Sequence, residues 1–456
     1  MKKNKYIETK NEITNLKIKD FFEQNYIDFA TYSSYRSIAS YVDGLKNSQR
    51  KVIWVVEKFN IVKETKILTL ASKTMDEAEY LHGDMSMNEV VTNLAKNYPG
   101  TNNLNLLYPE GHFGHRNNNE AAAPRYIMTH KEKYFNEIFV KDDKHIWNHQ
   151  LFEGKVIEPK YLLPILPLIL INGSVGIGTG FSQKILPRNP KRIIEILKNY
   201  LKKSKGFREI VPSINGFKGK IYKDSDNPKK IYYEGNYKIK NTTTIIIDEI
   251  PMTYDLVNYR KILEKLIENK IIKNYKDESN ENEFYFEIKC ERSLLKQSKE
   301  YILNTFELIK SEVENFTTIT ENNNIRVFNN EKELMMAFID FRLDKYEERR
   351  LFLINKLEME LLVVSAKYLF IKAILDKKII INNRKKDEII KDLEKNKFHL
   401  VDDSYNYLLN MHIYHQTIEE YNKLKELEQK LKDDIKVLEA LDNKKMWLKD
   451  LENLKI

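Results

Sequence analysis

One dipeptide of the sequence, Arg125-Tyr126, joins a nucleophile to a phosphate-binding group. A phenol oxygen can attack phosphorus after losing its proton, although free tyrosine has a pKa of about 10 and only about one molecule in a thousand is ionised at neutral pH. A guanidinium group binds two phosphate oxygens at once and can stabilise the charge of such a reaction. Because the chain has 27 tyrosines, the pair alone is weak evidence, and the surrounding segments must decide.

The segment that leads to this pair, residues 108–130, reads YPEGHFGHRNNNEAAAPRYIMTH. Small side chains occupy residues 121–124, and Gly111 and Gly114 allow the backbone to approach a ligand closely. Titratable or positive side chains stand in the same segment at His112, His115 and Arg116. The segment therefore combines a nucleophile, positive charge and little steric bulk.

A second cluster of positive charge stands at the start of an expected helix within residues 36–60, RSIASYVDGLKNSQRKVIWVVEKFN. Apolar residues at helical spacing predict the helix: Val52, Ile53, Val55, Val56 and Phe59. Lys46, Arg50 and Lys51 lie at its beginning, where side chains and free backbone N–H groups can both bind phosphate. A solvated helix start is the alternative interpretation of these three residues.

Two further segments carry weaker signals. His82 stands in the turn YLHGD, before a helix predicted by an apolar stripe at Met87, Val90, Val91 and Leu94. A lone histidine is more often structural or solvent-facing than catalytic. Residues 173–180, GSVGIGTG, look like a phosphate-binding glycine loop. They lack the Gly-Lys-Ser/Thr ending of a Walker motif, and no βαβ unit with a ribose-binding acid follows, so a nucleotide hydrolase is disfavoured.

Length and composition limit the class of protein. At 456 residues the chain is too long for one compact core, so several domains are expected, and its net charge of +9 fits a polyanionic partner. A single cysteine, Cys290, excludes an internal disulfide and a cysteine-based zinc cluster and indicates an intracellular protein. No signal peptide is expected, and the longest apolar stretch, residues 161–171, contains two prolines and is too short for a membrane span.

The second half of the chain changes character. Residues 191–294 alternate expected helices with strands rich in β-branched residues, and the pattern beyond them is mostly helical. Two apolar seams at three- and four-residue spacing follow, one in residues 343–375 and one in residues 424–441. Because shorter helices are expected between them, in residues 379–415, the seams predict an antiparallel coiled coil with a small helical cap.

These blocks, in this order, resemble the type IIA DNA topoisomerases, and the resemblance covers the chain from about Phe21 to its last residue. The small-residue run before Arg125-Tyr126 is closer to the eukaryotic and T-even-phage forms than to bacterial gyrase. The chain looks most like the medium subunit of the T-even-phage type, which is an A-type subunit for breakage and reunion. The alternative is a bacterial-type A chain without its C-terminal domain. Asn47 replaces a proline of the family pattern, and Leu81 replaces one of two adjacent histidines, so any role of that histidine does not transfer.

The resemblance implies an α+β multidomain fold with four parts. These are an N-terminal arm (residues 1–24), a winged-helix DNA-gate domain with the catalytic tyrosine (residues 25–190), an α/β tower domain (residues 191–298), and a long antiparallel coiled coil with a helical C-gate dimerisation domain (residues 299–456).

The resemblance also assigns roles to residues. Tyr126 is expected to cleave DNA through a 5′-phosphotyrosyl link, Arg125 and Arg36 to stabilise charge on the scissile phosphate, and His82 to hydrogen-bond that phosphate or move a proton. Ile177 falls where the family has an isoleucine that wedges between bases and bends DNA. The expected DNA-contacting residues are Lys46, Arg50, Lys51, Lys73, Arg116 and Ile177. No metal ligand is expected in this chain.

The function implied by the resemblance is the DNA-cleaving and rejoining subunit of an ATP-dependent type II topoisomerase that relaxes and decatenates DNA. The chain shows no ATPase module and no acidic Toprim signature, so an ATPase/Toprim large subunit, with or without a small subunit, is expected to bind ATP and hold Mg²⁺. Double-stranded DNA and a second copy of the chain, contacted at the DNA gate and the C-gate, are the other expected partners. The expected location is the cytoplasm or nucleoid of a host cell, away from membranes. The alternative is a catalytically inactive DNA-bending or coiled-coil architectural protein on the same scaffold.

Overall fold

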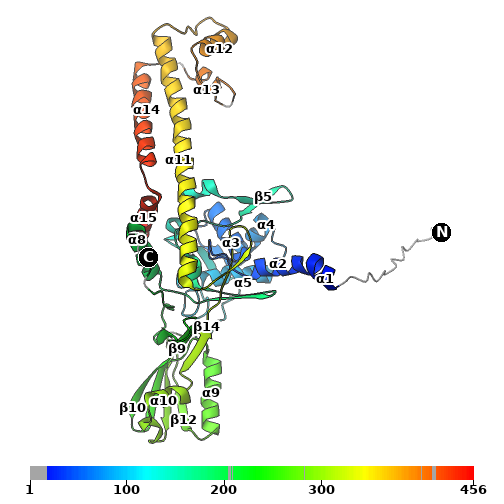
Figure 1. Ribbon diagram of the computed structural model, residues 1–456, viewed down its shortest axis with the longest axis vertical. Coiled ribbons are helices and arrows are strands. Elements are labelled where there is room, and N and C mark those ends of the chain that lie inside the picture. The colour runs from blue at the N-terminus through cyan, green and yellow to red at the C-terminus, as the bar shows by residue number, and fades with distance from the viewer. Residues whose placement is uncertain (1–17, 204–206, 208, 282, 402, 413–416) are drawn as a thin grey trace, which may run out of the picture. The chain divides into compact units, whose positions relative to one another are not determined.

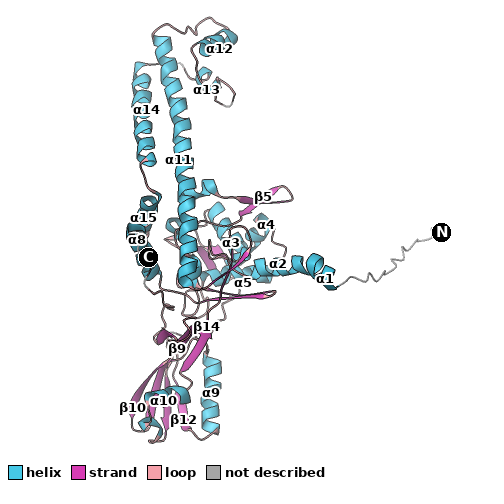
Figure 2. Ribbon diagram, viewed as in Figure 1, coloured by secondary structure: helices cyan, strands magenta, loops and turns pink. Residues whose placement is uncertain are grey.

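The computed structural model describes residues 18–203, 207, 209–281, 283–401, 403–412 and 417–456 (Figure 1). The chain divides into two compact units: unit one comprises the described parts of residues 1–135, 148–196 and 206–338, and unit two those of residues 136–147, 197–205 and 339–456. Unit one contains helices and strands, whereas the described residues of unit two form helices but no strand (Figure 2). The predicted α+β multidomain fold is therefore confirmed.

The first half of unit one is a helical bundle with a small sheet. Three helices pack against one another: α3 (Asn47–Lys58), α4 (Ile67–Glu77) and α5 (Asp84–Ala95). Three antiparallel strands form a sheet in the order β1-β3-β2: β1 (Thr65–Lys66), β2 (Leu107–Glu110) and β3 (Met128–Lys131). The apolar face expected for α3 is buried, since Val52, Val55 and Val56 are fully enclosed. The shorter elements are α1 (Ile18–Asp20), a π-helix (Phe21–Tyr26), α6 (Phe135–Ile138), β4 (His149–Phe152), β5 (Lys155–Pro159) and α7 (Leu168–Asn172).

A glycine-rich hairpin packs directly on a helix of this half. β6 (Ser174–Gly178) pairs with β7 (Phe181–Ile185), and β6 lies against α2 (Ile27–Ser37). A Cβ added at Gly176 would lie 2.1 Å from the carbonyl oxygen of Ser37, so a side chain there would push the hairpin off the helix. The glycines of this segment therefore serve close packing of the hairpin.

Residues 215–313, here named the tower, form an α/β region. The larger of its two antiparallel sheets has the order β10-β11-β13-β12: β10 (Asn236–Asn241), β11 (Thr244–Glu249), β12 (Ile272–Asp277) and β13 (Phe286–Cys290). The smaller sheet has the order β14-β9-β8: β8 (Lys220–Lys223), β9 (Lys230–Glu234) and β14 (Ile309–Val313). Helices α9 (Leu256–Glu268) and α10 (Lys299–Thr305) belong to the same region (Figure 1). A 3-10 turn (Leu294–Lys296) joins β13 to α10, and the apolar residues of both helices pack against Ile245, Ile247 and Phe286.

The described chain beyond residue 294 is mostly helical, as expected, but residues 309–328 are an exception that the sequence did not predict. β14 pairs with β9 of the tower, and β15 (Phe316–Ile319) pairs with β16 (Ile325–Phe328), so residues 309–328 are largely strand. Strands of four or five residues are too short for their two-residue period to stand out in the sequence. The division of the chain into four domains remains a prediction.

Unit two is built on two long helices. α11 (Glu331–Leu375) contacts α14 (Ile418–Glu439): Ser365 Oγ lies 3.0 Å from a carboxylate oxygen of Glu428, and Arg350 donates to the Leu438 carbonyl. Residues further along α11 therefore contact residues earlier in α14, so the two helices are antiparallel, as predicted. The other elements are a 3-10 helix (Lys141–Ile146), α8 (Pro190–Lys203), α12 (Lys386–Lys395), α13 (Asn406–Leu409) and α15 (Asn443–Asn453). Among the described helices, none has the length and apolar character needed to cross a membrane.

Asp43 is fully buried and organises the start of α3. Its carboxylate accepts hydrogen bonds from Nε of Arg50 at 2.6 Å and from the backbone N–H groups of Leu45 at 3.1 Å and Leu162 at 3.0 Å. Arg50 is itself 3 % exposed. The guanidinium of Arg50 is thus enclosed and neutralised inside the bundle, which does not favour a contact with DNA, and that contact stays a prediction.

We expect Asp43→Ala to destabilise unit one by about 3–5 kcal/mol, because Arg50 would remain as a buried charge without its carboxylate. Urea unfolding, followed by the fluorescence of Trp54 on the same helix in a background with the other two tryptophans replaced by phenylalanine, measures the change. Glu195→Ala, which removes an exposed ion pair with Arg192, is the control and should cost less than about 1 kcal/mol. Equal losses in both variants would contradict this account of Asp43.

Candidate active site

Tyr126 stands on a turn with its side chain in solvent. Its backbone N–H donates to the Ala123 carbonyl at 2.8 Å, and 68 % of the residue is exposed. Arg125 is exposed beside it, with the guanidinium carbon 4.9 Å from the centre of the Tyr126 ring. A phosphate that approaches the phenol oxygen can therefore also meet the guanidinium. The two residues expected to carry the chemistry lie together on an accessible surface.

The backbone of this turn is fixed although its side chains are exposed. Residues 111–127, here named the tyrosine loop, connect β2 to β3. The N–H of Ile67 donates to the Ile127 carbonyl at 3.1 Å, and the N–H of Leu68 donates to the Pro124 carbonyl at 3.2 Å. The first N–H groups of a helix have no hydrogen-bond partner within the helix. Two such N–H groups at the start of α4 bind the tyrosine loop, one on each side of Tyr126.

Arg36 and His82 form a second polar group, which also includes Tyr32. The Tyr32 hydroxyl and Nε2 of His82 share a short hydrogen bond. Partial burial and the nearby Arg36 charge lower the pKa of His82 from its ordinary value, so the imidazole is mostly neutral at pH 7. A neutral imidazole can accept a hydrogen bond or a proton. Sequence reasoning missed Tyr32, since no motif marks it and it lies 50 residues from its partner.

A cleft of about 680 Å³ lies between the tyrosine loop and the start of α5. Arg125 and Pro124 line one side of it, and Met85 and Ser86, a few residues after His82, line the other. Among the described residues, no hydrogen bond or ion pair joins the Arg125-Tyr126 pair to Arg36 or His82. The cleft therefore opens beside Arg125, and the fold brings both groups into unit one.

Ile177 lies near the tip of the β6–β7 hairpin and is 80 % exposed. Lys46, predicted to contact DNA, donates from Nζ to the Val175 carbonyl of the same hairpin at 2.7 Å, and partial burial lowers its pKa. An ammonium group has three N–H donors, so this hydrogen bond leaves two for phosphate. Lys46 therefore supports the hairpin that presents Ile177.

Two more of the predicted DNA-contacting residues, Lys51 and Arg116, are largely buried and paired with carboxylates, so their contact with DNA stays a prediction. Lys51 is 9 % exposed and binds the Glu158 carboxylate at 2.8 Å. Arg116 is paired with the buried Glu249 of the tower. Both cations are used inside the protein because a buried charge requires an opposite charge nearby. Lys73 lies 3.3 Å from the centre of the Phe59 ring, and its contact with DNA remains a prediction.

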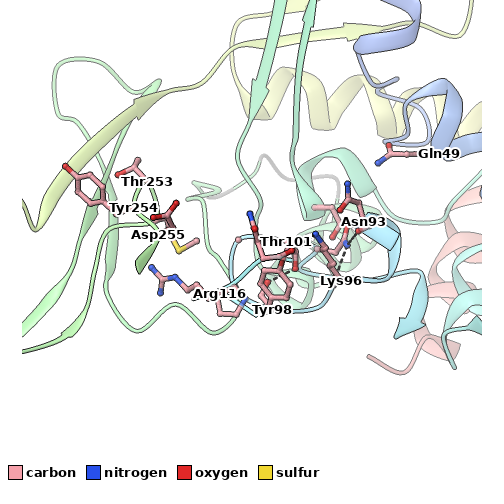
Figure 3. Close-up of a pocket in the computed structure, with 15 residues that line it drawn as sticks. Gln49, Asn93, Lys96, Tyr98, Thr101, Arg116, Thr253, Tyr254 and Asp255 are labelled. Atoms are coloured by element: carbon pink, nitrogen blue, oxygen red, sulfur yellow. Dashed lines mark hydrogen bonds between the residues drawn. The ribbon is translucent and has the colours of Figure 1, made fainter. Parts of the chain in front are cut away.

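A polar cleft of about 560 Å³ lies between the end of α5 and the tower (Figure 3). Asn93, Lys96 and Thr101 line one side of it, and Thr253 and Asp255 line the other. Burial lowers the pKa of Lys96, with Glu89 acting in the opposite direction. Sequence reasoning did not single out Lys96, because only the folded chain shows that this one of many lysines faces a cleft.

The described residues hold no group of three or more His, Cys, Asp or Glu side chains that could bind a metal ion.

Comparison with known proteins places these features in a family. The family model for the A-type chain of DNA gyrase/topoisomerase IV matches residues 36–452. The mitochondrial DNA topoisomerase 2 of Dictyostelium discoideum is 30 % identical over 450 residues, which are 96 % of this chain and 35 % of that protein. DNA topoisomerase 2 of Plasmodium falciparum is 31 % identical over 482 residues, covering 95 % of this chain and 34 % of that protein. This chain thus spans about a third of the length of these relatives.

A solved structure gives the same result for the fold. The DNA-binding, cleavage and re-ligation domain of Plasmodium falciparum topoisomerase II superposes with a TM-score of 0.83 at 30 % identity, covering 95 % of this chain and 63 % of that one.

We expect His82 to titrate below its ordinary pKa of about 6.5, and Arg36→Met to raise its pKa part of the way back, because burial remains after the charge is removed. NMR of ¹³C-labelled imidazole groups, with His82→Gln to assign the signal, measures both values. Arg125→Met is the control and should leave the His82 signal unchanged. A pKa of His82 that does not respond to the Arg36 substitution would contradict the electrostatic link between them.

Proposed function

The chain belongs to the A-type family of DNA gyrase/topoisomerase IV, and from that premise we propose that it cleaves and rejoins DNA for a type II DNA topoisomerase. The observation that carries the proposal is an exposed Tyr126, next to the Arg125 guanidinium, on a backbone hydrogen-bonded to the start of α4. The phenol is accessible to a duplex, and the backbone that carries it is held by hydrogen bonds within the chain. Both properties suit a nucleophile better than a surface tyrosine.

The proposed reaction is a transesterification. The Tyr126 phenol oxygen attacks a backbone phosphorus, a bond forms between that oxygen and phosphorus, and the bond from phosphorus to the 3′-oxygen breaks. The phenol proton leaves and the 3′-oxygen gains one, so the products are a 5′-phosphotyrosyl link and a free 3′-hydroxyl. The phosphodiester is exchanged and not hydrolysed, and the reverse step reseals the strand.

The nearby cations and the imidazole have separate proposed tasks. Arg125 binds the non-bridging phosphate oxygens and stabilises the charge that grows as phosphorus becomes five-coordinate. Arg36 binds the same phosphate. His82, held neutral at pH 7, hydrogen-bonds the phosphate or takes the phenol proton. The cleft of about 680 Å³ beside Arg125 leaves space for a strand.

Members of this family generally depend on Mg²⁺ and ATP. The described residues hold no group of three or more side chains that could bind a metal ion. Residues outside them are proposed to bind Mg²⁺ and ATP. An ATPase/Toprim partner chain is the proposed source. The finer assignment of the chain, to a T-even-phage type of medium subunit, stays an expectation, whereas the similar proteins of Dictyostelium and Plasmodium are eukaryotic.

The remaining assignments follow the same premise. A second copy of the chain would supply a second Tyr126, so that both strands of a duplex are cut, with contacts at a DNA gate and at a C-gate at the far end of the coiled coil. Double-stranded DNA is the proposed substrate, and the proposed location is intracellular and on DNA. An architectural protein that bends DNA without cutting it is the second candidate, favoured by the exposed Ile177 hairpin.

Tyr126→Phe should lower the amount of covalent DNA complex at least about a thousandfold, because it removes the nucleophilic oxygen. Non-covalent DNA binding should stay unchanged, because the phenol oxygen makes no described contact within the protein. The assay mixes the chain, supercoiled plasmid, Mg²⁺ and an ATPase/Toprim partner, denatures with detergent, and measures protein-linked linear DNA. Tyr108→Phe, another exposed tyrosine, is the matched control and should cleave normally.

Each other outcome of this assay has a defined meaning. A covalent complex formed by Tyr126→Phe would show that another residue is the nucleophile. Cleavage by the parent chain without any partner would refute the partner chain as the source of the metal site. No covalent complex from the parent chain under either condition would reject the enzyme in favour of the architectural protein.

Ile177→Ala should reduce DNA bending. Separating two stacked base pairs costs a few kcal/mol, and the isoleucine side chain offsets this cost only if it fills the space between them, which alanine is too small to do. Energy transfer between dyes at the two ends of a short duplex measures the bend, and the end-to-end distance should increase. Val156→Ala, an exposed aliphatic residue on the β4–β5 hairpin, is the control and should not alter the bend. An unchanged bend in Ile177→Ala would remove the wedge from the proposal.

A further inference from the structure

We infer that Arg116 is a positioning residue that ties the tyrosine loop to the tower and thereby holds Tyr126 in place for attack; the inference rests on the function proposed above. Arg116 was expected to bind DNA, but its side chain is largely buried in the fold.

The Arg116 side chain leaves the tyrosine loop and ends inside the tower. Its Nη1 forms an ion pair with Glu249 at the end of β11, and its Nη2 donates to the Ile250 carbonyl at 2.8 Å. The side chain is 11 % exposed and that of Glu249 is 3 % exposed. In Figure 3 the guanidinium points toward the side of the cleft that carries Thr253 and Asp255. Arg116 therefore crosses from one region of unit one to the other.

Two aromatic rings of the tower complete the binding site for this side chain. The guanidinium carbon lies 4.7 Å from the centre of the Phe284 ring and 5.5 Å from the centre of the Phe217 ring. A planar guanidinium can stack on a ring and still donate in its own plane to a carboxylate and a carbonyl. A lysine ammonium keeps the charge but has no plane, so it cannot make the same set of contacts.

The receptor for Arg116 is held in place by the tower itself. Glu249 Oε2 accepts from the Lys218 N–H at 2.9 Å, and its Oε1 accepts from the Ile250 N–H at 3.0 Å. These backbone donors orient the carboxylate independently of the tyrosine loop. Burial lowers the pKa of Arg116, and Glu249 opposes that shift, which agrees with a guanidinium that remains charged through this partner. The tower thus offers a fixed anchor.

A short path of hydrogen bonds leads from Arg116 to Tyr126. The N–H of His115 donates to the Asn118 carbonyl at 2.8 Å, and the N–H of Asn118 donates back to the His115 carbonyl at 3.1 Å, which closes a tight turn around Arg116. Further along the loop, the N–H of Ala122 donates to the His112 carbonyl at 2.9 Å. The next residue, Ala123, accepts the hydrogen bond that forms the Tyr126 turn.

A second side chain of the same turn also contacts the tower. Nδ2 of Asn117 donates to the Asn280 carbonyl. Gly114, just before this turn, has a φ of +86°, and a Cβ added there would lie 2.9 Å from the carbonyl carbon of Asn119, so the close packing of the loop at this point requires glycine. A shift of the tower relative to the bundle would therefore be passed to the tyrosine loop. The helix α4 fixes one end of the loop, and Arg116 fixes the other.

The test compares Arg116→Ala with the parent chain in the cleavage assay, at saturating DNA and with the partner present. We expect the rate of covalent complex formation to fall about 10–100-fold, since a displacement of about 1 Å can cost that much, while the Kd for uncleaved DNA changes less than about threefold. Added guanidinium ion at low millimolar concentration should restore part of the rate, whereas ammonium ion at equal ionic strength should not. Arg192→Ala, an exposed arginine, is the matched control and should behave as the parent.

The outcomes separate this inference from the proposed function. No covalent complex from the parent chain rejects the function, and the inference with it. Parent-like cleavage by Arg116→Ala, or a rate loss matched by an equal loss of DNA affinity, overturns the positioning role alone. Should Arg116→Ala fail to fold, as judged by Trp54 fluorescence, Arg116→Lys decides: slower cleavage with unchanged affinity supports the role, and parent-like cleavage overturns it.

Discussion

The hydrogen bonds from the first N–H groups of α4 to the tyrosine loop are what the rest of the site depends on. A nucleophile for a duplex has to stand in solvent, where side-chain packing cannot hold it, so its position must come from the backbone. Ile67 and Leu68 supply donors that a helix start would otherwise leave to water, and they bracket Tyr126 by binding the carbonyls of Ile127 and Pro124. The buried face of α3, against which α4 packs, fixes the helix that supplies these donors.

The same physical rule explains why a basic chain keeps several of its cations away from solvent. Arg50, Lys51 and Arg116 each reach a buried carboxylate, at Asp43, Glu158 and Glu249. A buried ion pair of this kind adds little net stability to the fold. Separating its two partners would leave a buried charge without its counter-charge, so the pair determines which segments of the chain lie together. These pairs join the start of α3 to its preceding turn and to the β5 strand, and the tyrosine loop to the tower. Net charge alone therefore does not identify the DNA-binding surface.

Local pattern was enough for the features that depend on neighbouring residues. The apolar face of α3 and the paired long helices could be predicted from the sequence, whereas the hairpin that carries Ile177 and the exposed turn that carries Arg125-Tyr126 are visible only in the structure. Partners distant in the chain could not be predicted: Arg116 and Glu249 are 133 residues apart, Tyr32 and His82 are 50 apart, and nothing in either local sequence marks the other. Strands β14 to β16 were missed because each is too short to show a period. The catalytic roles of Tyr126, Arg125, His82 and Arg36 stay predictions.

The separation of the two polar groups has a consequence for when the proposed chemistry can begin. In the free chain Arg36 lowers the pKa of His82, and among the described residues no hydrogen bond or ion pair joins either of them to Arg125. A DNA phosphate bound beside His82 would offset the Arg36 charge, which raises the pKa of the imidazole and makes it a better proton acceptor. The same phosphate would bring Arg125 and Arg36 to opposite sides of one phosphorus. Substrate binding would thus both complete the charge distribution and increase the basicity of the group proposed to take the phenol proton, so that Tyr126 is activated only when DNA is present.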